Sequence, residues 1–190
     1  MDIKIYKKFS IEDFVNEFNT CNSKLDTGSI NAITAACSVA LFKRAVLSLE
    51  NGEREEWLKR NASILEKYMI HLIDDDVKAR AGYIKERKTG NSINIEAAIH
   101  PACTINEEII NMLHQMLELN YECCKIVEKE MLHYLKESAY IALGAINSCI
   151  TWLLDITSNC SDETYRFIVK RENEITLGEC EELCKKILES

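Results

Sequence analysis

The sequence contains very few of the residues that interrupt helices. Of its 190 residues, one is proline and 6 are glycine. Folds built from short strands need many turns, and turns need these two residue types. Aromatic residues are also scarce at 7%, but hydrophobic residues together make up 47% of the chain. The sequence therefore argues against a turn-rich β fold, and its apolar content is ample for the core of one helical domain.

Three further absences narrow the classes of function. The formal net charge is -8, whereas non-specific nucleic-acid binding needs a basic face. Residues 1–14 contain lysines, but no apolar stretch follows them, so they do not form a secretory signal. The longest apolar runs are interrupted by Lys43 and Arg44 or by Asp155, which leaves them too short for a bilayer. We therefore expect a cytoplasmic protein that binds neither nucleic acid nor membranes.

The nine cysteines are not arranged as a disulfide framework or a metal site. Their number is odd, and no export signal accompanies them. Most lie within helical patterns, where a free thiol packs as a small hydrophobic group. Cys180 and Cys184 are four residues apart, which is the spacing of half a zinc site. No CxxC motif or nearby histidine supplies the other half, so no metal is expected.

The stretch from residue 24 to residue 49 is the segment around which the chain is organised. It opens with the turn-forming quartet Asp26-Thr27-Gly28-Ser29 and continues as a helix rich in small residues. Alanines at 32, 36 and 40 share one face, which lets another helix approach closely. The start of such a helix presents free N–H groups and a positive dipole end, which together suit an anion or a carbonyl. The alternative is a glycine-containing turn that only starts a buried helix.

A run of three acids lies within the next predicted helix, from Arg54 to about Lys85. The run reads Ile73-Asp74-Asp75-Asp76. Three consecutive helical positions span about 200° of the circumference, so the three carboxylates point in different directions. Asp76 lies three residues after Ile73 and four after Leu72, which places it on the apolar side. A carboxylate there is either paired or functional; the alternative is a solvated acidic surface.

The other elements follow from capping motifs and apolar periodicity. A short helix opens with the Ser10–Asp13 capping box and runs through Cys21. A kink or short break at Pro101 precedes a second capping box, which starts a helix from Thr104 to His133. After it come a small-residue helix from Ser138 to Ile156, an extended piece from Tyr165 to Val169, and a last helix from Thr176 to Leu188. The predicted fold class is all-α: one domain over residues 1–190, an antiparallel bundle of five or six helices, one of them kinked or broken near Pro101.

The small-residue helices also predict a homodimer. Ala32 to Ala40 and Ala142 to Ser148 offer more close-packing surface than one bundle needs. The alternative is that the two faces pack on each other within one chain.

The order of these elements resembles the cyclodeaminase domain of formimidoyltransferase-cyclodeaminase, a family that includes stand-alone bacterial methenyltetrahydrofolate cyclohydrolases. The resemblance covers nearly the whole chain. The family's Pro-Gly-Gly-Gly-Ser turn corresponds to Leu25-Asp26-Thr27-Gly28-Ser29, where the last glycine and the serine remain. Its Leu-Ile-Asp-x-Asp pattern corresponds to Leu72-Ile73-Asp74-Asp75-Asp76. Its Val-Pro-Leu break is matched only by Pro101, and its Ser-Asp pair reads Ser138-Ala139, so that acid is missing. Its Asn-Val-x-Ile-Asn motif is not recognisable at residues 157–161.

The resemblance implies a function, a ligand and a dimer. Members of this family open or close the one-carbon bridge between two nitrogens of tetrahydrofolate. A tetrahydrofolate derivative would then be the substrate, with no tightly bound cofactor. A carboxylate suits this chemistry as general base and counter-charge, which makes Asp76 the expected catalytic residue. Asp26, Gly28 and Ser29 are the expected ligand-binding residues, and the ligand pocket is expected between Ser29 and Asp76.

Two other functional classes stay open. One is a degenerate family member that binds a ligand or a protein partner without catalysis, as the missing acid at Ala139 would allow. The other is an unrelated helical bundle with a regulatory role.

Overall fold

The chain folds into a bundle of long helices, seen here in a computed structural model that describes residues 4–20 and 23–190. The α-helices are α1 (Ile11–Phe18), α2 (Thr27–Val46), α3 (Glu53–Thr89), α4 (Ser92–Cys123), α5 (Leu132–Thr157) and α6 (Glu163–Glu189), and two short 3-10 helices are η1 (Tyr6–Lys8) and η2 (Lys129–Met131). No strand occurs in the described ranges. The predicted all-α class is confirmed.

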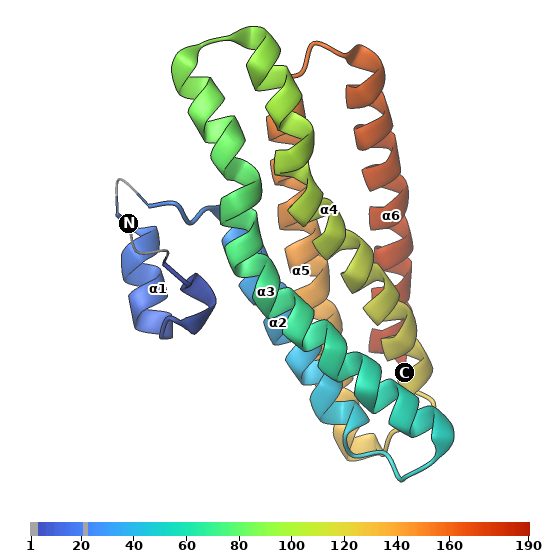
Figure 1. Ribbon diagram of the computed structural model, residues 1–190. Helices are drawn as coiled ribbons and strands as arrows, with labels where there is room; N and C mark the ends of the chain where they lie inside the picture. Colours follow the sequence, from blue (N-terminus) through green and yellow to red (C-terminus); the bar gives the residue numbers. More distant parts are fainter. Residues whose placement is uncertain (1–3, 21–22) are drawn as a thin grey trace.

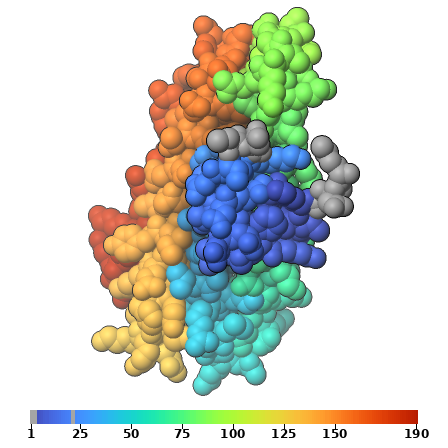
Figure 2. Space-filling view, turned by 90° about the vertical axis from the view of Figure 1, so that its left-hand side faces the viewer, coloured from blue at the N-terminus to red at the C-terminus, as the bar shows by residue number. Residues whose placement is uncertain are grey.

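Helices α2 to α6 run alternately up and down (Figure 1). Helix α2 packs against α3 and α5, and α4 contacts α2, α3, α5 and α6. The small N-terminal elements η1 and α1 lie outside this bundle, beside α2 and α3 (Figures 1 and 2). The five long helices therefore form the body of the molecule, and the N-terminal segment is an addition on one side.

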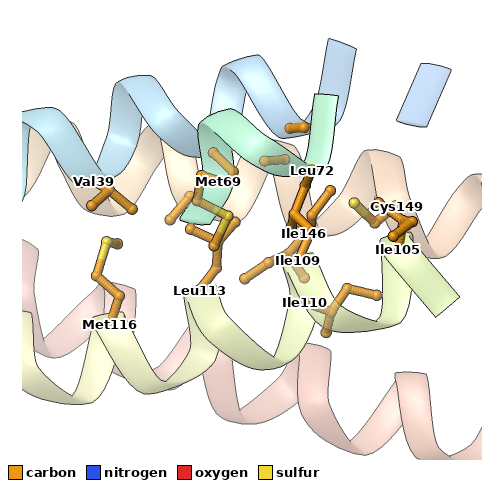
Figure 3. Close-up of a cluster of buried hydrophobic side chains, with 14 of the residues drawn as sticks. Val39, Met69, Leu72, Ile105, Ile109, Ile110, Leu113, Met116, Ile146 and Cys149 are labelled. Atoms are coloured by element: carbon orange, nitrogen blue, oxygen red, sulfur yellow. The ribbon is translucent and has the colours of Figure 1, made fainter. Parts of the chain in front are cut away.

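The core lies where α2, α3, α4 and α5 meet (Figure 3). Side chains with no exposed surface come from all four helices, among them Val39, Met69, Leu113 and Ile146. Each buried side chain of this size contributes roughly 1.5–3 kcal/mol relative to leaving it in water. The small residues Ala32 and Ala35 are also fully buried, which lets α2 approach its neighbours closely.

The difference in length between α2 and its neighbours creates a space in the bundle. Helix α2 has 20 residues and α3 has 37, so they are about 30 and 55 Å long at 1.5 Å per residue. Helix α3 therefore continues well beyond the first residue of α2, and α5 ends on the same side (Figure 1). The cleft described below lies at this end of α2.

Of the kink or break predicted near Pro101, the break does not occur, because α4 runs without interruption from Ser92 to Cys123 with the proline inside it. An interior proline removes one helical hydrogen bond and costs about 3 kcal/mol in a helix on its own. Here the flanking residues Ile99, Ala102 and Cys103 are completely buried, so packing against the other helices outweighs that cost. Thr104 is not a cap; its hydroxyl donates to the His100 carbonyl within the helix.

The boundary between α4 and α5 was also predicted wrongly. The helix expected to reach His133 ends at Cys123, and α5 begins at Leu132 rather than at Ser138. The turn between them carries no glycine or proline to mark it. It is fixed instead by the buried Asn120, whose amide donates to the Leu135 carbonyl at 3.0 Å.

Two predictions near the ends of the chain need correction. Tyr165 to Val169, predicted as extended, belongs to α6, which Asp162 caps by accepting a hydrogen bond from the Tyr165 backbone N–H. The start predicted at Thr176 is therefore the middle of that helix. The first helix begins after Ser10 as predicted, but it ends at Phe18; its predicted end, Cys21, lies outside the described residues.

Residues Lys129–Thr157, which contain α5, are long and apolar enough to cross a membrane by length and composition alone. The sequence analysis expected no such run. In the bundle α5 packs against α2, α4 and α6, and Leu135, Ala142, Ile146 and Leu153 are fully or almost fully buried. Its apolar character therefore fits that of a central core helix.

The alanine face of α2 is only partly buried. Ala32 is inaccessible, Ala36 is half-buried and Ala40 is exposed. On α5, Gly144 is exposed and Ser148 is half-buried. Some small residues of the two helices thus pack inside the bundle, and others remain on its surface.

Candidate functional site

A cleft of about 800 Å³ opens at the N-terminal end of α2. Its volume falls within the range of small-molecule sites. Helix α3 forms one side through Arg80, Tyr83, Ile84, Arg87 and Lys88, and α5 forms another through Trp152, Asp155 and Ile156. The start of α2 contributes Asp26 and Thr27, and the preceding chain contributes Phe18, Thr20, Ser23 and Leu25.

The lining combines flat apolar groups with charges of both signs. Tyr83 and Trp152 supply aromatic rings, and the Arg87 guanidinium lies 5.8 Å from the centre of the Tyr83 ring. Arg87 and Lys88 are exposed cations at the mouth. Asp155 is an exposed carboxylate, and no salt bridge among the described residues includes it. The cleft can therefore hold a planar ring and anionic groups, and it offers a carboxylate able to take a proton.

Arg80 links the cleft to a buried carboxylate behind it. Its Nε lies 3.4 Å from Oδ2 of Asp76, its Nη1 pairs with the Asp26 carboxylate, and its Nη2 donates to the Lys24 carbonyl at 3.0 Å. The Arg80 side chain is only 5% exposed, whereas that of Asp26 is 43% exposed. A chain of charges thus runs from the fully buried Asp76 to Asp26 at the surface of the cleft.

Asp76 is held in the interior by α2 as well as by Arg80. It has no exposed surface, and the Ser29 hydroxyl donates to its Oδ2 at 2.7 Å. Its other oxygen, Oδ1, has no hydrogen-bond partner among the described residues. Burial raises the pKa of Asp76 above its ordinary value, and this effect exceeds the opposing effects of the Arg80 charge and the Ser29 hydrogen bond.

Gly28 is required by this contact rather than by its backbone conformation. Among the described residues only Gly90 is a glycine with a positive φ. A Cβ built on Gly28 would lie 2.6 Å from Cγ of Asp76 and 3.1 Å from its Oδ2, and closer still to Oδ1. The absence of a side chain at Gly28 therefore makes the room that the buried carboxylate occupies.

The three acids of α3 have three different surroundings. Asp74 accepts hydrogen bonds from the backbone N–H groups of Tyr6 and Lys7. Asp75 pairs with Lys78 at the surface. The solvated-surface interpretation thus applies to Asp75 alone, and Asp76 faces inward as its spacing predicted.

The predicted ligand-binding residues divide into two groups. Asp26 lines the cleft, whereas Gly28, Ser29 and Asp76 are buried behind it and are not part of its lining. Ser29 and Asp76 are in direct contact, so the pocket predicted between them is not there; the cleft lies one turn away, beside Asp26 and Arg80. Among the described residues no side chain caps α2, because Asp26 directs its carboxylate to Arg80. The backbone N–H groups of Ser29 and Ile30 donate to the Asp26 carbonyl, and of the first turn of α2 only Thr27 lines the cleft.

Several cleft residues were missed by sequence reasoning. Arg80 was detectable, because it lies four residues after Asp76 on the same helix, the spacing of a helical ion pair. Trp152 and Asp155 gave no signal, because only tertiary structure brings the end of α5 beside the start of α2. Ala139, where the sequence analysis noted a missing acid, lies 13 residues before Trp152 on α5, or about 20 Å along the axis. An acid at that position would not reach this cleft.

Comparisons with known proteins identify the fold. No family model matches the sequence, and no curated protein matches it. Among solved structures, the chain is similar to formiminotetrahydrofolate cyclodeaminase from Thermotoga maritima, with a TM-score of 0.79 and 16% sequence identity over 97% of this chain and 98% of that one. The resemblance drawn from the order of the elements is therefore confirmed for the fold. At 16% identity this likeness shows the fold alone.

Proposed function

We propose that the chain binds a reduced folate in the cleft and acts on its one-carbon group, as a methenyltetrahydrofolate cyclohydrolase or a formiminotetrahydrofolate cyclodeaminase does. The observation that carries the proposal is the composition of the cleft on this fold. Tyr83 and Trp152 suit a flat pterin ring, and Arg87 and Lys88 suit the carboxylates at the other end of a folate. The likeness to a solved cyclodeaminase supports the same ligand class.

Asp155 is the side chain best situated for proton transfer. In the cyclohydrolase reaction water adds to the methenyl carbon, and one carbon–nitrogen bond then breaks to give a formyl group. The released nitrogen takes one proton of the water, and a base must remove the other proton. Asp155 would accept that proton as general base, since it faces the cleft and is not engaged in a salt bridge among the described residues. Asp26, held by Arg80, would supply the counter-charge for the methenyl cation.

Asp76, the catalytic residue expected from sequence, takes a different role in this proposal. Its carboxylate has no exposed surface, so it does not contact the ligand. It fixes Arg80, which in turn orients Asp26. Asp76 is therefore a positioning residue, and Ser29 and Gly28 hold it in place.

The test is the absorbance of 5,10-methenyltetrahydrofolate in the presence of the purified chain. We expect the chain to accelerate its loss, and we expect Asp155→Asn to reduce the rate about 10²- to 10⁴-fold, the usual contribution of a general base. Asp75→Asn is the matched control, because within the described part of the chain the Asp75 carboxylate pairs with Lys78 alone, at the surface. Loss of the substrate at the uncatalysed rate would reject the enzymatic proposal.

A second candidate is binding without catalysis. It is favoured by the burial of the expected catalytic carboxylate, Asp76. In that case the cleft would bind a reduced folate at one site per chain, and methenyltetrahydrofolate would not be consumed. Binding and turnover measured on the same preparation separate the two candidates.

The proposal includes a homodimer, as the sequence analysis expected. Ala36 and Ala40 on α2, and Gly144 and Ser148 on α5, are exposed or half-buried, and α2 and α5 are neighbours. A second copy would cover these small residues.

A further inference from the structure

We propose that Asp74 is a positioning residue whose carboxylate holds residues 4–20 against the bundle. These residues form one side (the wall) of the cleft, and this wall can open while helices α2–α6 stay folded. This inference rests on the cleft being the ligand site of the proposed function. Asp74 belongs to the acidic run singled out in the sequence, and neither the proposed chemistry nor the buried network uses it.

The first observation is that Asp74 makes the polar attachment of this segment. Its Oδ1 accepts from the Tyr6 N–H at 2.7 Å and from the Lys7 N–H at 3.4 Å, and its Oδ2 lies 3.8 Å from Lys7 Nζ. Within the described residues, every hydrogen bond between residues 4–20 and helices α2–α6 ends on this carboxylate. The Asp74 side chain is only 13% exposed, so water competes poorly for these bonds.

The second observation is that the segment forms part of the cleft. Phe18 and Thr20 line it opposite α3 and α5. They lie at and just beyond the end of α1, and the segment's backbone meets the bundle through η1 and α3. Side chains of the segment, Tyr6 and Phe14, are buried. If the hydrogen bonds from Tyr6 and Lys7 to Asp74 are lost, the part of the segment that carries Phe18 is no longer held on the bundle by polar contacts.

The third observation concerns the stability of α1 by itself. It has eight residues, and helices shorter than about 12 residues are marginal in water without tertiary contacts. The Lys4–Glu17 pair, which joins α1 to the residues before it, is partly exposed and contributes little. The segment therefore depends on docking for its order, and undocking would open the cleft and unfold α1 together.

The test compares Asp74→Ala with Asp75→Ala. Asp75 is the adjacent acid on the same helix, and among residues 4–20 and 23–190 its one ion pair is with Lys78, so it controls for the loss of charge. Hydrogen exchange of the apo protein should be about 10- to 100-fold faster in residues 4–20 of Asp74→Ala, as expected for the loss of hydrogen bonds to a charged acceptor. Helices α2–α6 should keep their protection in both variants.

A second measurement reports on the cleft without any ligand. In a Trp57→Phe background the single remaining tryptophan is Trp152, which lines the cleft. Quenching of its fluorescence by acrylamide should increase in Asp74→Ala and stay unchanged in Asp75→Ala. Asp74→Asn keeps an acceptor oxygen and should give an intermediate effect, which provides a milder variant if the alanine protein folds poorly.

Two results would overturn the proposal: equal exchange in the Asp74 and Asp75 variants, or faster exchange of residues 4–20 with unchanged quenching of Trp152. The first result would show that Asp74 does not hold residues 4–20 on the bundle. The second would show that residues 4–20 do not shield the cleft from solvent. A separate titration of the wild-type chain with 5-formyltetrahydrofolate distinguishes failure of the proposed function. If the wild type binds this folate, Asp74→Ala should weaken the binding. If the wild type does not bind it, the proposed folate ligand is rejected, and the exchange and quenching results still test whether Asp74 holds residues 4–20 in place.

Discussion

Substitution of Gly28 by alanine would push a methyl group into the Asp76 carboxylate. The added Cβ would lie 2.6 Å from Cγ of Asp76, a distance that requires one of the two residues to move. Asp76 has no exposed surface, and Ser29 and Arg80 hold it from two sides. The carboxylate therefore has no exposed position beside it into which it could move.

The expected cost combines two effects. Overpacking of a buried site costs about 1–3 kcal/mol, and displacing the carboxylate from the Ser29 hydroxyl adds about 1.5–3 kcal/mol for a hydrogen bond to a charged group. The greater helix propensity of alanine returns at most about 1 kcal/mol. We therefore expect Gly28→Ala to lower the free energy of unfolding by about 1.5–6 kcal/mol, and the melting temperature by roughly 3–24 °C for a chain of this size.

The assay is urea unfolding followed by far-UV circular dichroism. Gly178→Ala is the matched control, because Gly178 is an exposed residue inside α6 and a Cβ there meets no other group within 4 Å among the described residues. That variant should be stabilised by about 0.5–1 kcal/mol. Asp76→Ala in the Gly28→Ala background should relieve part of the cost, so the two changes should not be additive. A Gly28→Ala protein as stable as the wild type would refute the close contact.

Three further predictions concern charge and assembly. Since the pKa of Asp76 is raised in the folded state, the folded protein holds the Asp76 proton more tightly than the unfolded chain does. As pH rises above the ordinary aspartate pKa of 3.8, the free energy of unfolding of the wild type should therefore fall relative to that of Asp76→Asn. Parallel curves of stability against pH for the two proteins would contradict this. Arg80→Met leaves the buried Asp76 without its cation and should cost about 3–5 kcal/mol at pH 7 by urea unfolding; a change below about 1 kcal/mol would show that the pair is not maintained. Sedimentation equilibrium at micromolar concentration should give a dimer mass, which Ala40→Glu should reduce to the monomer mass; a monomeric wild type would reject the dimer.

The helical class and most of the bundle could be predicted because they depend on local properties. The scarcity of breakers and the long apolar periodicity of α3 both lie in short stretches of sequence. The end of α3 was placed near Lys85, whereas the helix continues to Thr89 and Gly90 caps it. The inward direction of Asp76 followed from its spacing to Leu72 and Ile73. These features need no knowledge of which helix packs on which.

The errors arose where tertiary packing outweighed a local signal. Pro101 is a strong breaker, but the burial of Ile99 and Ala102 on both sides keeps α4 continuous. The aromatic and β-branched residues after Asp162 looked extended, but the cap and the packing of α6 make them helical. The cleft itself could not be predicted, because it depends on the difference in length between α2 and α3 and on the end of α5, where Trp152 and Asp155 lie.

The most direct test of the account is whether a reduced folate binds in the cleft. The measurement is a titration of the Trp57→Phe protein with 5-formyltetrahydrofolate, followed by the fluorescence of Trp152, which lines the cleft. The account predicts saturable quenching with a dissociation constant between about 1 µM and 1 mM, the usual range for enzyme substrates. It also predicts weaker binding in Arg87→Ala, which removes a cation from the mouth of the cleft. Fluorescence that does not saturate up to about 1 mM, or binding that Arg87→Ala leaves unchanged, would contradict it.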